Sequence, residues 1–200
     1  MRVKSRRNGN QYSMKPYFQC LMVAGVVSLG LGCASGKSSP ASNDSANPSS
    51  SKARAKAVAV LSPAPNGKVK GQVTFLEETE GVRVTANVEG LTPGKHGFHI
   101  HEKGDCSSPD FTSAGGHFNP TNSKHGSPTD PEHHAGDFGN LEANEQGVAR
   151  FERVFTWLTF KGTNSILGKG VIVHEKTDDF SQPTGNAGGR LACGVIQSTP

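Results

Sequence analysis

The sequence predicts an all-β fold, an antiparallel Greek-key β-sandwich or barrel of about eight short strands with two long functional loops. Three observations predict it. Gly (25 residues) and Pro (12 residues) are frequent while aromatic residues make up only 6% of the chain, which favours short strands and turns over long helices. Several short segments alternate apolar and polar residues with a period of two. The length of 200 residues leaves room for one ordinary domain and some additional chain.

The expected strands begin with a hairpin. Residues 69–75 and 82–88 alternate apolar and polar side chains, and Gly81 lies in the turn between them. Because these segments are short and show no helical period, they favour an antiparallel sandwich or barrel. Four later segments continue the series: 97–101, 147–156, 166–173 and 191–196.

Two long stretches do not fit the strand pattern. Residues 102–140 and 175–190 are polar and rich in Gly, and they hold or flank most of the His and Asp residues of interest. Loops longer than about 12–15 residues inside a compact domain are usually functional or disordered. We therefore expect these two loops to carry the chemistry.

The N-terminal segment is typical of an export signal. Residues 1–15 include five basic residues and no acidic one, and residues 16–32 are apolar and small. A basic region before a short apolar one is the pattern of a secretory signal peptide, and the apolar run is too short and too Gly-rich for a convincing membrane span. Met14 precedes a second compact signal, so the natural start could be Met1 or Met14.

The end of this signal resembles a bacterial lipobox, whose Cys becomes the lipidated first residue of the mature protein. The run Leu29-Gly30-Leu31-Gly32-Cys33 departs from the usual box in having Gly30 three places before the Cys. We expect residues 1–33 to be the signal peptide with lipidation at Cys33, residues 34–57 a disordered Ser- and Ala-rich tether, and residues 58–200 the folded domain. The protein would then be exported and lipid-anchored to a bacterial membrane in the cell envelope. Ordinary cleavage beside an unmodified Cys33 is the alternative.

The charge distribution argues against nucleic acid as a partner. The formal net charge is +4, but the excess of positive charge belongs to the N-terminal segment. From Val58 onward, 12 Lys and Arg residues stand against 16 Asp and Glu residues, which gives −4. No basic stripe or arginine cluster is present in the sequence.

The cysteine count fits an exported protein. Of the four Cys residues, Cys20 lies in the signal and Cys33 is the candidate for lipidation. The remaining pair, Cys106 and Cys193, most simply forms one disulfide in an oxidising compartment. Two buried free thiols are the alternative.

The histidines point to metal binding. His99 and His101 flank Ile100 in a strand-like segment, so alternation directs both imidazoles to the same face of the sheet. Three more imidazoles and one carboxylate follow, a set of four ligands that zinc accepts readily, although a solvated polar loop is the alternative reading. His174 ends the apolar run 171–173. Such an imidazole-rich set suits copper, zinc, iron or nickel. The seven candidate ligands are His99, His101, His117, His125, His134, Asp137 and His174.

Five segments together resemble the copper–zinc superoxide dismutase family, and they follow one another in order between residues 58 and 197. They are Gly97-Phe98-His99-Ile100-His101-Glu102, Thr112-Ser113-Ala114-Gly115-Gly116-His117-Phe118-Asn119-Pro120, Gly136-Asp137-Phe138-Gly139-Asn140, Val173-His174-Glu175-Lys176 and Gly185-Asn186-Ala187-Gly188-Gly189-Arg190-Leu191-Ala192-Cys193-Gly194.

The resemblance implies one copper and one zinc ion per subunit and the dismutation of superoxide to oxygen and hydrogen peroxide, here protecting the cell envelope. Copper would be held by His99, His101, His117 and His174. Zinc would be held by His117, His125, His134 and Asp137, with His117 bridging the two metals. Asp178 would link a copper histidine to a zinc histidine, Arg190 would attract the anionic substrate, and Cys106 and Cys193 would form the family disulfide. His96 and His133 would be structural or surface residues.

The sequence departs from the family between His174 and Arg190. That loop is shorter than in the well-known eukaryotic members and carries Gln182-Pro183-Thr184 in place of charged residues. Steering by additional lysines of that loop therefore does not carry over from the resemblance, and Lys103, Lys124 and Lys176 are candidates to substitute for it in part.

Two rival functions are a copper store or delivery protein without turnover and a structural adhesin. A homodimer is possible. Trp157 and Phe160 are expected in the core rather than in such an interface.

Overall fold

The computed structural model describes residues 54–200. The predicted signal peptide, Cys33 and nearly all of the predicted tether lie outside these residues. The described part contains nine strands and one short 3-10 helix, η1 (Thr112–Ala114). The strands are β1 (Lys56–Pro63), β2 (Lys70–Glu78), β3 (Gly81–Glu89), β4 (Gly94–His101), β5 (Asp137–Ala143), β6 (Ala149–Phe155), β7 (Gly170–His174), β8 (Arg190–Val195) and β9 (Gln197–Thr199).

The strands form one closed antiparallel barrel. Their order is β2-β3-β6-β5-β4-β7-β8-β1-β9, and the pairing of β1 with β2 closes a ring of eight. The connection from β3 to β4 and the connection from β6 to β7 each pass over two intervening strands, which gives the predicted Greek-key arrangement and confirms the fold class. The three-residue β9 extends the pairing of β8 with β1 past Ile196 in the same register.

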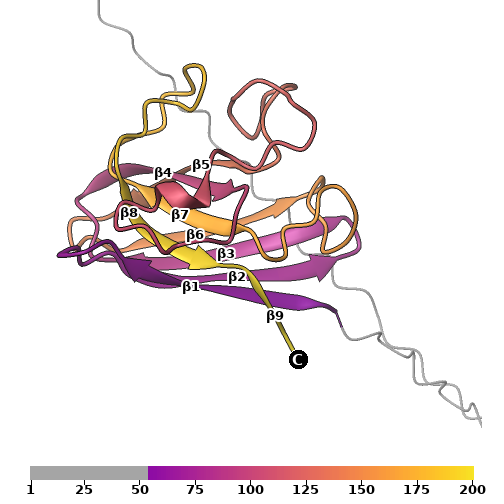
Figure 1. Ribbon diagram of the computed structural model, residues 1–200, viewed down its shortest axis with the longest axis horizontal. Helices are drawn as coiled ribbons and strands as arrows, with labels where there is room; N and C mark the ends of the chain where they lie inside the picture. The colour runs from indigo at the N-terminus through magenta and orange to yellow at the C-terminus, as the bar shows by residue number, and fades with distance from the viewer. Residues whose placement is uncertain (1–53) are drawn as a thin grey trace, which may run out of the picture. The chain divides into compact units, whose positions relative to one another are not determined.

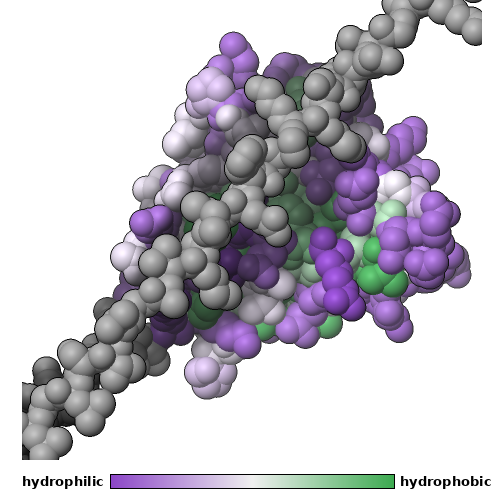
Figure 2. Space-filling view, turned by 180° about the vertical axis from the view of Figure 1, so that it is seen from behind, coloured by the Kyte–Doolittle hydropathy of each residue, from purple (hydrophilic) through white to green (hydrophobic). Residues whose placement is uncertain are grey.

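The barrel interior is the hydrophobic core, and alternation along each strand fills it. In β3, for example, Val82, Val84, Ala86 and Val88 are all buried and the residues between them face outward. Figure 2 shows a mostly hydrophilic outer surface in the view from behind, with hydrophobic residues exposed in small areas. Phe160 lies in the core and Trp157 packs against it, as predicted. Among residues 54–200, no helix has the length and apolar character needed to cross a membrane.

The β2–β3 hairpin explains the glycine expected in its turn. Gly81 is the first residue of β3 and pairs with Glu78 across the turn formed by residues 79–80. Its φ is 138°, a conformation that disfavours other residues, and a Cβ there would lie 2.3 Å from the carbonyl oxygen of Phe155. The hairpin therefore needs glycine at this position both for its backbone and for its close approach to β6.

Several predicted boundaries need correction. β1 begins at Lys56, two residues before the predicted start of the domain. The predicted strand 166–173 begins only at Gly170. The predicted loop 102–140 ends at residue 136, because β5 begins at Asp137. Sequence alternation does not reveal the start of β5, since Asp137, Phe138 and Gly139 are all buried in succession.

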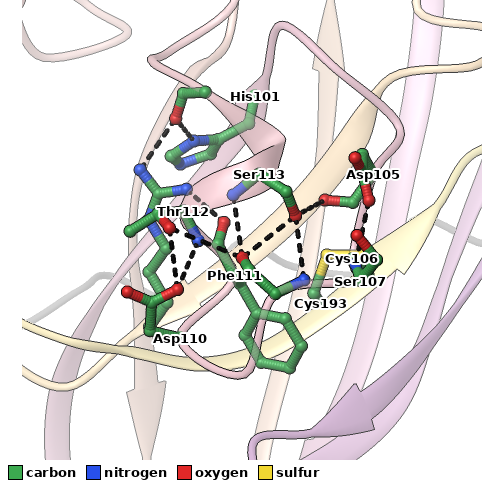
Figure 3. The surroundings of a disulfide bond; sticks show 12 residues. His101, Asp105, Cys106, Ser107, Asp110, Phe111, Thr112, Ser113 and Cys193 are labelled. Atoms are coloured by element: carbon green, nitrogen blue, oxygen red, sulfur yellow. Dashed lines mark hydrogen bonds between the residues drawn. A yellow bond between two sulfur atoms is a disulfide. The ribbon is translucent and has the colours of Figure 1, made fainter.

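The two long loops rise from the same side of the barrel (Figure 1). The first, residues 102–136, joins β4 to β5 and contains η1. The second, residues 175–189, joins β7 to β8. A disulfide between Cys106 and Cys193, 87 residues apart, ties the first loop to β8 (Figure 3). The predicted disulfide is therefore confirmed.

We expect the disulfide to stabilise the barrel by constraining the unfolded chain. Replacing both cysteines, Cys106→Ser with Cys193→Ser, should lower the free energy of unfolding of the metal-free protein by about 2–4 kcal/mol. Denaturant unfolding measures the change. Reduced wild-type protein is the control and should match the double variant. A free energy of unfolding equal to that of the oxidised wild type would contradict the prediction.

Candidate metal centre

The candidate ligands lie on the outer side of the barrel wall, beneath the two long loops. β4 supplies His99 and His101, while the intervening Ile100 belongs to the barrel core, as alternation predicted. β7 ends at His174 and β5 begins at Asp137. The loop 102–136 supplies the other three: His117, His125 and His134. All seven side chains are buried, and the fold brings all of them together.

The first group consists of four histidines whose ligand atoms all lie within 4.8 Å of one another: His99, His101, His117 and His174. The Nε2 atoms of His101 and His174 are 3.4 Å apart. The Nδ1 atoms of these two rings face the carbonyl oxygens of Gly115 at 2.9 Å and Gly188 at 3.3 Å. Because a carbonyl only accepts, each Nδ1 donates a proton and each Nε2 presents a lone pair. Two facing lone pairs suit a shared cation.

His99 gives a second sign of a metal ion. Its Nε2 donates to Asp178 Oδ2 at 2.8 Å, which leaves Nδ1 as an acceptor. That Nδ1 is buried and has no hydrogen-bond partner among the described residues. A buried polar atom left unpaired costs about 1–3 kcal/mol. A cation bound by the group would satisfy it, so the residues fit the copper that the sequence implied.

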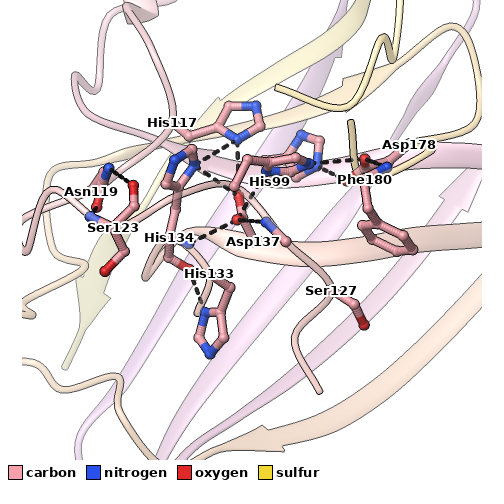
Figure 4. Close-up of polar contacts among 12 residues, drawn as sticks. His99, His117, Asn119, Ser123, Ser127, His133, His134, Asp137, Asp178 and Phe180 are labelled. Carbon is pink, nitrogen blue, oxygen red and sulfur yellow. Dashed lines mark hydrogen bonds and ion pairs between the residues drawn. The ribbon is translucent and has the colours of Figure 1, made fainter. Parts of the chain in front are cut away.

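The second group contains three imidazoles and one carboxylate: His117, His125, His134 and Asp137. Asp137 Oδ1 lies 2.9 Å from His117 Nδ1 and 3.3 Å from His134 Nδ1, and Asp137 Oδ2 lies 2.9 Å from His125 Nδ1 (Figure 4). The backbone N–H groups of Gly126 and His134 also donate to Oδ2. Three nitrogen ligands and one oxygen ligand suit a tetrahedral zinc ion.

His117 belongs to both groups. Its Nδ1 faces Asp137 and lies 3.3 Å from His134 Nδ1, so Nε2 is the atom left for the first group. The ring centroid of His117 is 4.0 Å from that of His99. One imidazole therefore stands between the two groups.

Asp178 links the groups a second time from the loop 175–189. Its Oδ1 accepts from His125 Nε2 at 3.0 Å, while its Oδ2 accepts from His99. The backbone of Asp178 is held by Asn140, whose amide donates to the carbonyl at 3.0 Å and accepts from the N–H at 2.8 Å. Outer contacts of this kind fix ring orientation in metal sites. The sequence argument missed Asn140, because no spacing pattern marks an amide that binds backbone.

Burial sets the protonation of the first group. It lowers the pKa of His174 to about 3 and that of His117 to about 4, with the nearby His99 adding to both shifts. Burial and the neighbouring His117 also hold the pKa of His101 well below its ordinary value. These imidazoles are therefore neutral at pH 7, as metal ligands must be.

Two carboxylates raise the pKa of His125, which is opposite to the effect of burial on the pKa values of the first group. Burial alone would lower its pKa, but hydrogen bonds to Asp137 and Asp178 outweigh burial and raise the pKa to about 9. Burial likewise would raise the pKa values of both carboxyls, yet the hydrogen bonds from the surrounding histidines hold them below their ordinary values. Both carboxylates are ionised at pH 7.

An open cavity of about 340 Å³ reaches the first group. Its lining includes His101, His117 and His174, together with Arg190. The guanidinium of Arg190 donates to the carbonyl oxygens of Phe111 at 2.6 Å and Gly115 at 2.7 Å. Burial lowers the pKa of Arg190, but an arginine remains charged at any physiological pH. A small anion entering this cavity meets a fixed positive charge beside the histidines.

The remaining histidines are structural, as predicted. His96 is buried, with Nδ1 2.9 Å from the carbonyl oxygen of His174 and Nε2 3.2 Å from the hydroxyl of Thr92. His133 binds the carbonyl oxygen of His134, and its ring packs against Trp157 with centroids 4.3 Å apart. Neither belongs to a ligand group within the described residues.

A closed Greek-key barrel with two four-ligand groups sharing one histidine on its outer wall defines a class of β-barrel protein with a binuclear metal centre. The family model described as copper/zinc superoxide dismutase (SODC) matches residues 69–196. The chain belongs to that family. It is an oxidoreductase whose cofactors are copper and zinc.

Two similar proteins support this assignment. The chain is 51% identical over 153 residues to superoxide dismutase [Cu-Zn] A of Xenopus laevis, an alignment that covers 72% of this chain and 99% of the frog protein. The crystal structure of the clock protein EA4 matches with a TM-score of 0.67 at 41% identity, covering 72% of this chain and 95% of that one. Because the Xenopus relative is eukaryotic, the bacterial lipoprotein type stays a prediction.

We expect Asp178 to support both metal groups. In Asp178→Asn, the amide can accept from only one of the two imidazole N–H groups and turns a donor toward the other. Zinc affinity should fall about 10–100-fold, measured by competition with a chelator. The neighbouring Asp179→Asn is the matched control, since Asp179 is exposed and contacts Ser181 and Asn186 rather than a ligand. Equal zinc affinities for the two variants would contradict this role.

Proposed function

We propose that the protein converts superoxide to oxygen and hydrogen peroxide with copper bound by the first group and zinc bound by the second. His117, which belongs to both groups, would be a ligand shared by the two ions. The observation that carries this proposal is the placement of His117 in both ligand groups, at the end of a cavity that also contains Arg190.

The reaction consumes two superoxide anions and two protons and yields one molecule each of oxygen and hydrogen peroxide. One superoxide is oxidised and the other is reduced, so no external oxidant or reductant is needed. Bound copper supplies the one-electron couple that this exchange requires, whereas zinc has no redox chemistry of its own.

Arg190 binds and orients the anion. A guanidinium carries five N–H donors, and the carbonyl oxygens of Phe111 and Gly115 engage two of its nitrogens. The remaining donors are available for a small anion in the cavity. Because the main chain fixes the guanidinium, little side-chain entropy is lost when the anion binds.

His117 provides a place for a proton. Its Nδ1 faces Asp137 in the second group, so Nε2 is the atom directed toward the first group. When Nε2 is not engaged by a cation, it can hold a proton beside the cavity that can be passed to the peroxide product. In the metal-free protein this imidazole is neutral at pH 7, because burial lowers its pKa to about 4.

The rival functions explain fewer of these features. A copper store needs ligands but has no use for a guanidinium fixed at the cavity. An adhesin leaves seven buried ligands and the orphaned His99 Nδ1 unexplained.

Steering of the substrate is supported best for Lys176. Lys124 forms an ion pair with Glu132 at 3.6 Å, which cancels much of its field. The stem of Lys176 packs against Gly188, whose added Cβ would lie 3.0 Å from Lys176 Cγ, and Gly188 lines the cavity. Lys103 is exposed outside that lining.

Loss of one ligand of the first group should abolish turnover. We expect the copper- and zinc-loaded His174→Ala variant to lose more than about a hundredfold in superoxide dismutation, because removing a ligand costs more than the 10–100-fold typical of outer contacts. His133→Ala is the matched control and should stay active. Full loading of the wild type with both metals but without turnover would overturn the proposal and favour a copper-handling role.

We also propose that the protein is exported and lipid-anchored at Cys33, where it protects the cell envelope. The support is the basic and apolar order of residues 1–32 followed by Cys33. In a bacterial host, the full chain should sediment with membranes and Cys33→Ser should shift it to the soluble fraction. Equal partitioning of both forms would favour ordinary cleavage instead. A homodimer stays a prediction.

A further inference from the structure

The short loop 175–189 contacts one histidine through three alternate residues. We call residues 178–182 the strap. Asp178 accepts a hydrogen bond from the His125 imidazole, and the Phe180 ring lies beside that imidazole with centroids 6.3 Å apart. Figure 4 shows Phe180 next to Asp178 at the edge of the histidine cluster. Gln182 binds the backbone of the same His125.

Gln182 forms two hydrogen bonds with the backbone of His125. Its Nε2 donates to the carbonyl oxygen of His125 at 2.7 Å, and its Oε1 accepts from the N–H of His125 at 3.2 Å. The two bonds engage both backbone groups of one residue, as a neighbouring β-strand would. His125 lies in the long loop 102–136 and belongs to none of the strands, so it lacks the support that β4 gives to His99 and His101.

The backbone of Phe180 shows that the strap is held in an unfavourable shape. Its φ of 61° is left-handed, a conformation that is uncommon and strained for a bulky residue. This shape turns its N–H toward Asp178 Oδ1 at 2.9 Å, the oxygen that also accepts from His125. Contacts with the surrounding residues must therefore stabilise this backbone conformation of Phe180.

The strap continues directly into the wall of the cavity. Gly185 N–H donates to the carbonyl oxygen of Ser181 at 2.7 Å, and Asp179 N–H donates to that of Gly185. Thr184 and Asn186, on either side of Gly185, line the cavity beside Arg190. One short segment therefore contacts His125 on one side and the substrate cavity on the other.

We propose that Gln182, with Phe180, is a positioning residue that fixes the zinc ligand His125 through its backbone and ring. The inference rests on the proposed function, because it takes His125 as a ligand of zinc. It assigns a role to Gln182 in the loop 175–189, which joins β7 to β8. Asp178 orients the imidazole, Phe180 packs beside it, and Gln182 fixes the main chain that carries it.

The test compares zinc and copper binding in Gln182→Met, which keeps the length of the side chain and removes both hydrogen bonds. Zinc affinity of the full chain, measured by chelator competition, should fall roughly tenfold, while copper affinity stays unchanged because β4 and β7 carry three of the four copper ligands. Gln146→Met is the matched control, since Gln146 is exposed in the β5–β6 turn. Phe180→Ala should also weaken zinc binding.

The visible absorption spectrum of bound Co²⁺ distinguishes a positioning role of Gln182 from an effect on the overall stability of the protein. Co²⁺ placed in the zinc site should show shifted visible absorption bands in Gln182→Met but not in Gln146→Met, because the ligand geometry changes. Unchanged zinc affinity and an unchanged Co²⁺ spectrum in Gln182→Met would overturn the inference, as would equal losses of zinc and copper affinity. The His125→Ala variant tests the proposed function separately from the inference about Gln182. If it abolishes zinc binding while Gln182→Met does not alter it, the proposed function stands and the inference fails.

Discussion

The metal centre depends on two buried carboxylates placed among buried imidazoles. Asp137 contacts three histidines of one group, and Asp178 joins the two groups through His99 and His125. Without a partner, each buried carboxylate would be costly to ionise. The surrounding N–H donors and the bound cations offset that cost. Carboxylate, imidazole and metal therefore stabilise one another, and removing any one leaves the others with unsatisfied charge or lone pairs.

The barrel strands hold part of the metal centre rigidly. The ligands that lie in the loops are held in place by other contacts. β4 and β7 place three histidines on a paired sheet whose other face is the hydrophobic core. Of the three histidines of the loop 102–136, His117 forms an isolated β-bridge with His101 of β4, whereas His125 and His134 lie outside the strands and their bridges. Their positions come from the disulfide, from main-chain hydrogen bonds to Asp137, and from the strap of the second loop. This division explains why contacts that look minor, such as the one from Gln182 to His125, bear on metal binding.

The same loops join substrate recognition to the fold. The carbonyl oxygen of Gly115 accepts from both His101 Nδ1 and Arg190, so one main-chain atom orients a candidate metal ligand and the cation proposed to bind the substrate. Phe111, whose carbonyl also holds Arg190, packs in a small apolar cluster with Cys193. The disulfide thus lies next to the residues that aim the guanidinium at the cavity, and a change in the loop reaches the site through that contact.

The sequence alone determined the fold class and the pairing of Cys106 with Cys193, and it predicted the seven candidate ligands, Arg190 and Asp178, because period-two alternation and closely spaced motifs are local in the chain and the motifs resemble a known family. It did not predict β5, since Asp137, Phe138 and Gly139 are buried in succession and break the alternation. Only the tertiary structure showed that Asn140 and Gln182 hold the backbones of Asp178 and His125, and that the Gly115 carbonyl orients His101. Such contacts join residues 14 to 57 positions apart and involve main-chain atoms, which every residue possesses, so no pattern of side chains could reveal them.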